Sequence, residues 1–176
     1  MQLQLAGYFP KLTAVPPGWT AIDPVDEICS VSTCIAPAPD GWIKRWLHND
    51  LGFYNTVHDA SSIIPPGSEG YSVFAYKLLP VRFGDEAEPW PLPDLAVEPL
   101  PPSFRSLGFD IASKDLSDFF ECSPLSCNGI ATEVHVNRYC LVESLERAFS
   151  LAERFALGPG VEPGYYHVLE VLRDPG

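Results

Sequence analysis

The chain is short of positive charge. Its 176 residues include 11 lysines and arginines against 23 aspartates and glutamates, which gives a formal net charge of −12 at pH 7. Nucleic-acid-binding proteins need clustered Lys and Arg to contact phosphates, and anionic membrane surfaces attract basic segments. The composition therefore argues against both kinds of partner. It suits a basic protein partner, because complementary charge speeds association and rejects wrong partners. The alternative is that the net charge only keeps the protein soluble.

Long apolar segments and targeting signals are also missing. No stretch approaches the ~20 apolar residues needed to span a bilayer. Residues 1–7 have neither the basic region nor the long apolar run of a secretory signal. We therefore expect a cytoplasmic protein, whose five cysteines are thiols or metal ligands rather than disulfides.

Familiar catalytic and ligand-binding motifs are absent from the sequence. It has no Walker pattern, no Gly-x-Gly-x-x-Gly and no Gly-x-Ser-x-Gly. The histidines His48, His58, His135 and His167 have no metal-type spacing such as His-x-x-x-His. These absences make an enzyme less expected without excluding one.

What the chain does contain is a repeated six-residue motif. Residues 29–34 read Cys-Ser-Val-Ser-Thr-Cys, and residues 122–127 read Cys-Ser-Pro-Leu-Ser-Cys, with both cysteines displaced by 93 positions. Further matches surround the motif: Asp40-Gly41 with Asn128-Gly129, Asn49 with Asn137, Ala60 with Ala148, Gly70-Tyr71 with Gly164-Tyr165 and, loosely, Gly7-Tyr8 with Gly108-Phe109. The pattern predicts a diverged tandem duplication of one supersecondary unit.

Hydrophobic periodicity and capping residues predict the elements of each unit. Residues 28–35 are expected to be a short buried strand or tight turn. Thr56 and Ser144 are expected to cap helices that end near Ile64 and Leu157. The expected strands are residues 3–15, running into Pro10, then 42–49, which a helix would also fit, 71–83, limited by Pro80, 107–112, 130–137 and 165–173.

These elements predict an α+β fold. We interpret it as a pseudo-twofold internal duplication of a strand–Cys motif–strand–helix–strand unit. The sheet would be mixed or antiparallel, with the long strands at its centre and the helices packed on it. The units would be residues 1–84 and 105–176, joined by a Pro-rich linker at 85–104 that Trp90 and Leu95 anchor, all in one compact domain.

The repeated cysteines Cys29, Cys34, Cys122 and Cys127 are the sharpest candidate site. If the pseudo-twofold axis brought them together, four thiolates could hold a zinc ion. The spacing within each pair is wider than the two intervening residues usual for zinc. Buried structural thiols, disulfides and catalysis are the alternatives.

A cysteine nucleophile is the catalytic alternative. Cys127 is followed by His135 and Glu133, and a thiol, an imidazole base and an orienting carboxylate form a valid nucleophilic arrangement. Nearness in sequence does not place these side chains together in the fold.

Three functions follow from these observations. The first is a non-enzymatic acidic interaction protein that binds a basic protein partner, as an immunity or inhibitor protein does. The second is a small enzyme that uses Cys127 with His135 as its base. The third is a structural module stapled by zinc.

Overall fold

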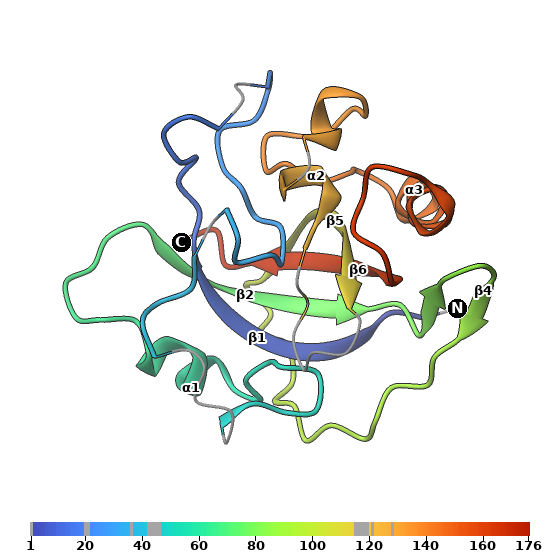
Figure 1. Cartoon of the computed structure of the whole chain (residues 1–176). Helices are drawn as coiled ribbons and strands as arrows, with labels where there is room; N and C mark the ends of the chain where they lie inside the picture. The colour runs from blue at the N-terminus through green and yellow to red at the C-terminus, as the bar shows by residue number, and fades with distance from the viewer. Residues whose placement is uncertain are drawn as a thin grey trace.

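The computed structural model describes residues 2–19, 22–35, 37–41, 47–114, 120, 122–127 and 129–176. Within these residues six strands form one antiparallel sheet (Figure 1), which confirms the α+β class. The strands are β1 (Gln4–Leu12), β2 (Tyr71–Leu78), β3 (Val81–Phe83), β4 (Ala87–Pro89), β5 (Arg105–Lys114) and β6 (Tyr165–Arg173). The helices are α1 (Val57–Ser62), α2 (Pro124–Cys127), the 3-10 helix η2 (Ile130–Thr132) and α3 (Leu145–Leu157).

The two long apolar strands β2 and β6 pair with each other at the centre of the sheet, as the sequence predicts. β1 lies on the outer side of β2, and β5 pairs along the whole of β6. The short β3–β4 hairpin joins β6 through the pair Phe83 and Tyr166. Buried side chains on these strands contribute to two hydrophobic clusters, which together form the core.

Pro10 and Pro80 affect their strands in different ways. β1 continues through Pro10 to Leu12. The Tyr8 N–H donates away from β2 to Tyr54, and the Pro10 nitrogen two residues later faces the same way, so Pro10 costs no bond to β2. Pro80 interrupts regular pairing, as the sequence predicts, and residues 71–83 form two strands, β2 and β3.

Both helix caps are confirmed. Thr56 Oγ1 accepts a hydrogen bond from the Asp59 N–H at 2.9 Å, and Ser144 Oγ accepts one from the Arg147 N–H at 3.2 Å. These bonds satisfy backbone donors that the first turn of a helix leaves free. α1 packs against β1 and β2, whereas α3 packs against β6, β5 and β3.

The strand predicted over 130–137 is wrong. The segment forms η2 and then a loop, although its side chains alternate in burial as a strand's would, with Val134 and Val136 buried. Gly129 enters η2 with a φ of 70°, and the segment belongs to none of the sheet's ladders. Most of the matching prediction over 42–49, residues 42–46, lies outside the described residues.

Two loops with the same hydrogen bonds border the outer strands. Asn49 donates to Ala6 O, and its Oδ1 accepts from the Leu51 and Phe53 N–H groups. Asn137 donates to Leu107 O, and its Oδ1 accepts from the Tyr139 and Leu141 N–H groups. Each loop then pairs with its strand, Tyr54 with Tyr8 and Val142 with Phe109.

The Pro-rich segment connects the β3–β4 hairpin to β5. Trp90 and Leu95 pack against the core, as the sequence predicts. The Tyr8 hydroxyl donates to the backbone oxygen of Glu98 at 3.0 Å and so holds the segment against β1. None of the helices in the described part of the chain has both the length and the apolar character needed to cross a bilayer.

Candidate functional site

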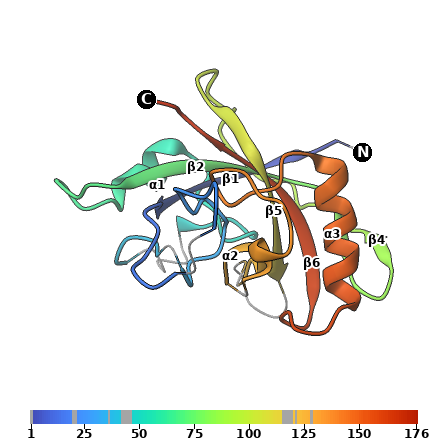
Figure 2. The same cartoon turned by 90° about the horizontal axis from the view of Figure 1, so that it is seen from above.

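The two Cys-Ser motifs, 93 residues apart in sequence, lie side by side in the fold. Ser30 Oγ is 2.8 Å from Ser126 Oγ, and Ser32 Oγ is 3.1 Å from Cys127 Sγ. Figure 2 shows α2, which carries the second motif, beside the loops of the N-terminal half. We call residues 29–34 and 122–127, together with Lys11 and Asp110, the motif junction.

Asp110 on β5 ties the two motifs together. Its Oδ2 accepts from the Val31 N–H of the first motif at 2.6 Å, and its Oδ1 accepts from the Ser123 hydroxyl of the second motif at 2.6 Å. Burial raises the pKa of the Asp110 carboxyl to about 6, while these hydrogen bonds and nearby Lys11 act in the opposite direction. One buried side chain therefore holds both copies of the motif.

Lys11 on β1 supplies the opposite charge. Its ammonium group donates to Ser30 O and, at 2.5 Å, to Ser32 O. Complete burial lowers the pKa of Lys11 to about 8, and the charge of Asp110 opposes that shift. Strand registers place Lys11 and Asp110 on the same face of the sheet. A buried cation from one half and a buried carboxyl from the other thus meet at the junction.

Sequence reasoning missed Lys11 and Asp110. A signal was present, because each is a charged residue inside an apolar strand, Lys11 between Pro10 and Leu12 and Asp110 between Phe109 and Ile111. Charged side chains are almost never fully buried unless they are paired. Both are 0% exposed.

Cys127 is the cysteine whose surroundings stabilise a thiolate. A hydrogen bond from the Cys122 thiol lowers the pKa of Cys127 well below its ordinary value, and hydrogen bonds from Ser32 and Ser126 add to this effect against the cost of burial. The same contact keeps the proton on Cys122, whose pKa is raised. Cys127 is half-buried and Cys122 is buried.

The other two repeated cysteines have different surroundings. Cys29 is buried, and burial raises the pKa of its thiol to about 12. Cys34 is exposed. Across the described residues, no group of three or more His, Cys, Asp or Glu side chains could hold a metal ion. The four-cysteine zinc site stays a prediction from the sequence.

His135 and Glu133 lie in a separate surface pocket. Both side chains are exposed, and they line an open pocket of about 400 Å³ together with Ile22 and Asp23. The described contacts of the Cys127 thiol are with Cys122, Ser32 and Ser126 instead. The catalytic grouping of Cys127, His135 and Glu133 therefore stays a sequence-based prediction.

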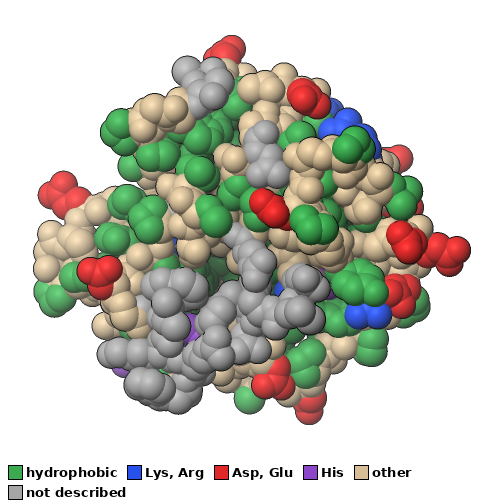
Figure 3. Space-filling model, viewed as in Figure 1, with side chains coloured by type: hydrophobic (Ala, Val, Ile, Leu, Met, Phe, Trp, Pro, Cys, Tyr) green, Lys and Arg blue, Asp and Glu red, His purple; other side chains and the backbone are tan. Residues whose placement is uncertain are grey.

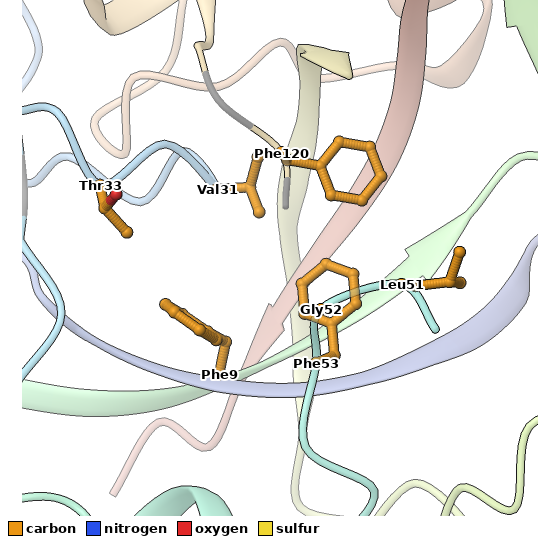
Figure 4. A pocket seen from close by; sticks show the side chains of 7 residues that line it. All are labelled: Phe9, Val31, Thr33, Leu51, Gly52, Phe53 and Phe120. Atoms are coloured by element: carbon orange, nitrogen blue, oxygen red, sulfur yellow. The ribbon is translucent and has the colours of Figure 1, made fainter. Parts of the chain in front are cut away.

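A small apolar pocket adjoins the first motif. Figure 4 shows the rings of Phe9, Phe53 and Phe120 around it, with Val31 and Thr33 reaching it from the motif. Phe53 stacks on Phe120 with a centroid distance of 5.7 Å. The cavity, about 20 Å³, has room for a single water-sized group. We interpret it as an imperfection of core packing.

A larger groove lies between the β3–β4 hairpin and α3. Asp85 and Glu86 line it from the hairpin, and Glu153 and Leu157 line it from the helix, around about 250 Å³ of space. All three carboxylates are exposed. Figure 3 shows acidic side chains on the side of the molecule where these elements lie. We call this feature the acidic groove.

We compared the chain with protein-family models, curated proteins and solved structures. Its sequence and its fold have no significant match among them.

Proposed function

We propose that this chain is an acidic interaction protein that binds a basic protein partner, as an immunity or inhibitor protein does. The acidic groove is the observation that carries the proposal. Its carboxylates come from two different elements, and Leu157 beside them is 67% exposed. An exposed apolar side chain with charged residues around it is typical of a protein–protein interface. In such an interface a few central contacts supply most of the binding energy.

The groove's charge is available to a partner. Four cations of the described residues form ion pairs with carboxylates outside the groove: Lys77 with Glu170, Arg82 with Glu88, Arg138 with Asp26 and Arg173 with Glu27. Within the described residues, Asp85, Glu86 and Glu153 take part in no ion pair of this kind. Their negative charge therefore favours lysine or arginine side chains of another protein.

An aromatic side chain borders the hairpin of the groove. The Tyr165 ring packs against Gly84, and the Arg82 guanidinium lies 4.2 Å from its centroid. Tyr165 is still 37% exposed. Tyrosine is among the residue types enriched at interface hot spots, so Tyr165 and Leu157 are the apolar anchors that the proposal assigns to the interface.

To test the proposal, the three carboxylates of the acidic groove are replaced by neutral amides. The triple variant Asp85→Asn, Glu86→Gln, Glu153→Gln is used beside the native chain to capture proteins from the source cells. The basic protein retained by the native chain is then purified and titrated against both. We expect the variant to bind the partner about tenfold more weakly than the native chain does, a difference of ~1.4 kcal/mol. The affinity of the native chain for the partner should also fall as the salt concentration is raised.

A matched control separates the groove from overall charge. Asp50→Asn, Glu69→Gln, Asp94→Asn removes the same charge from exposed positions outside the groove. Equal losses in both variants would assign binding to net charge alone. An affinity that changes with neither variant nor salt would reject the electrostatic proposal.

We also propose that the two halves are diverged copies of one unit. The matching Asn49 and Asn137 loops support this. So does the sheet register: Gly7 is opposite Tyr76, Gly108 is opposite Val171, and Tyr76 is opposite Val171 across the central pair. The residues opposite the two glycines thus pair with each other, as a twofold axis through the central pair of strands would require.

A further inference from the structure

Cys122 and Cys127 form a contacting thiol pair at the two ends of one turn. Cys127 ends α2, and its N–H donates to Ser123 O at 2.8 Å, which closes the turn. On the other side, the Ser113 N–H donates to Cys122 O at 2.8 Å and holds Cys122 against the end of β5. The two side chains are hydrogen bonded to each other. The backbone therefore presents two sulfurs to one another.

The two thiols differ in accessibility and in charge. Cys127 is half-buried, whereas Cys122 is buried. Ser32 Oγ at 3.1 Å and Ser126 Oγ at 3.8 Å lie against the Cys127 sulfur, and the Lys11 ammonium is close enough to interact with it electrostatically. These neighbours favour a thiolate on Cys127, the reactive form of cysteine.

The remaining cysteines lack this combination. Burial raises the pKa values of the Cys29 and Cys140 thiols to about 12, and both side chains are 0% exposed. Cys34 is exposed but belongs to the other motif. Site-selective oxidation follows thiolate character and access together, so Cys127 is where reaction would begin.

We propose that Cys122 and Cys127 are a reversible redox-modification site, which low-molecular-weight disulfides convert to an intramolecular disulfide. The site is separate from the acidic groove and does not depend on the function proposed for that groove. Because Cys127 also contacts Ser32 of the first motif, oxidation would remove the thiolate that joins the two motifs.

The chemistry is thiol–disulfide exchange. The Cys127 thiolate attacks one sulfur of R–S–S–R, a mixed disulfide forms, and one R–S⁻ leaves. The Cys122 thiol then gives its proton to a released thiolate and attacks the Cys127 sulfur, which expels the second R–S⁻. The Cys127 thiolate and the Cys122 thiol are oxidised to one disulfide, and R–S–S–R is reduced to one R–SH and one R–S⁻.

The experiment uses the full chain and glutathione disulfide as the probe. The protein is treated with a chelator, incubated with graded ratios of reduced to oxidised glutathione, quenched with N-ethylmaleimide and digested with trypsin. Cleavage after Lys114 and Arg138 releases one peptide, 115–138, that contains both cysteines. We expect this peptide to lose the mass of two hydrogens, to be protected from N-ethylmaleimide, and to regain both thiols when dithiothreitol is added.

Single substitutions test the order of attack. Cys127→Ser should abolish reaction at the pair, whereas Cys122→Ser should leave Cys127 as a stable mixed disulfide with one glutathione. Cys34→Ser is the control and should leave oxidation of the peptide 115–138 unchanged. Near-ultraviolet circular dichroism checks that each variant is folded. If a variant does not fold, the mass change of peptide 115–138 from the native chain still tests the proposal.

Two results would overturn the proposal. One is a native chain whose peptide 115–138 keeps two alkylatable thiols at every glutathione ratio. The other is a disulfide that links this peptide to peptide 12–44, which carries Cys29 and Cys34, because Cys127 would then pair with the first motif instead of with Cys122.

Discussion

At the residue scale, two buried charges organise the contact between the halves. Lys11 bonds to carbonyls of the first motif, and Asp110 accepts hydrogen bonds from both motifs. Burial makes each charge costly, and removing one of two such partners leaves the other uncompensated. The junction therefore contributes specificity to the fold, since few other arrangements of the chain would satisfy both groups.

The depressed pKa of Lys11 predicts a pH dependence of stability. In the folded chain Lys11 releases its proton near pH 8, whereas its ordinary value is 10.5. The unfolded chain therefore binds more protons between these values, so the free energy of unfolding of the native chain should rise through this window relative to that of Lys11→Met. The expected rise is about 3 kcal/mol. Urea unfolding at several pH values measures it, and parallel curves would contradict the prediction.

At the element scale, each outer strand is bent around a glycine. The register of β1 shifts between Leu5 and Gly7, and that of β5 shifts between Ser106 and Gly108. The two glycines have φ values of 141° and 136°. Each register shift is a β-bulge. Because glycine has no side chain, the Asn49 and Asn137 loops can approach the strands closely at these bulges.

Alanine at either bulge glycine should be strongly destabilising. A Cβ on Gly7 would lie 2.7 Å from Tyr54 O, and one on Gly108 would lie 2.8 Å from Val142 O. We expect Gly7→Ala and Gly108→Ala each to lower the free energy of unfolding by about 3 kcal/mol, from strain and lost pairing together. Chemical denaturation measures the loss.

Gly18→Ala is the matched control for these glycines. Its φ is also positive, 85°, but a Cβ there has no neighbour within 4 Å. It should cost about 1 kcal/mol, from backbone strain alone. If all three substitutions lower the free energy of unfolding by the same amount, close approach of the loops does not explain why glycine occupies positions 7 and 108.

At the scale of the whole molecule, the two halves share one sheet and one polar junction. β2 of the first half pairs with β6 of the second half through five residue pairs, from Phe74 and Arg173 to Leu78 and Leu169. The Val31 N–H of the first half donates to Asp110 of the second half. Neither half keeps these contacts if the other unfolds, so separate domains are not expected.

Because the two halves share the central strand pair and the motif junction, we expect the whole chain to unfold in a single cooperative transition. Far-ultraviolet circular dichroism reports the sheet, and tryptophan fluorescence reports local packing, such as Trp90 against His167, whose ring centroids are 4.3 Å apart. In urea, both signals should give the same midpoint and the same slope. Two separated midpoints would mean that the halves unfold independently.

Much of the fold follows from the chain's local patterns. The capped starts of α1 and α3, the central strands β2 and β6 and the anchoring of Trp90 and Leu95 are all predicted, because capping residues and apolar periodicity act over a few neighbouring residues. Residues 130–137 show the limit of such patterns. Alternating burial there reflects packing of a loop on the core, and a strand also needs a partner edge.

By itself, the sequence determined the acidic charge, the repeated motif and the order of the main elements, since these depend on composition and on local spacing. Only the tertiary structure decided that the motifs meet, that Lys11 and Asp110 are buried between them, and that Cys127 contacts Cys122 and Ser32. The physical reason is that burial, and the hydrogen bonds that make burial tolerable, arise between residues far apart in the chain.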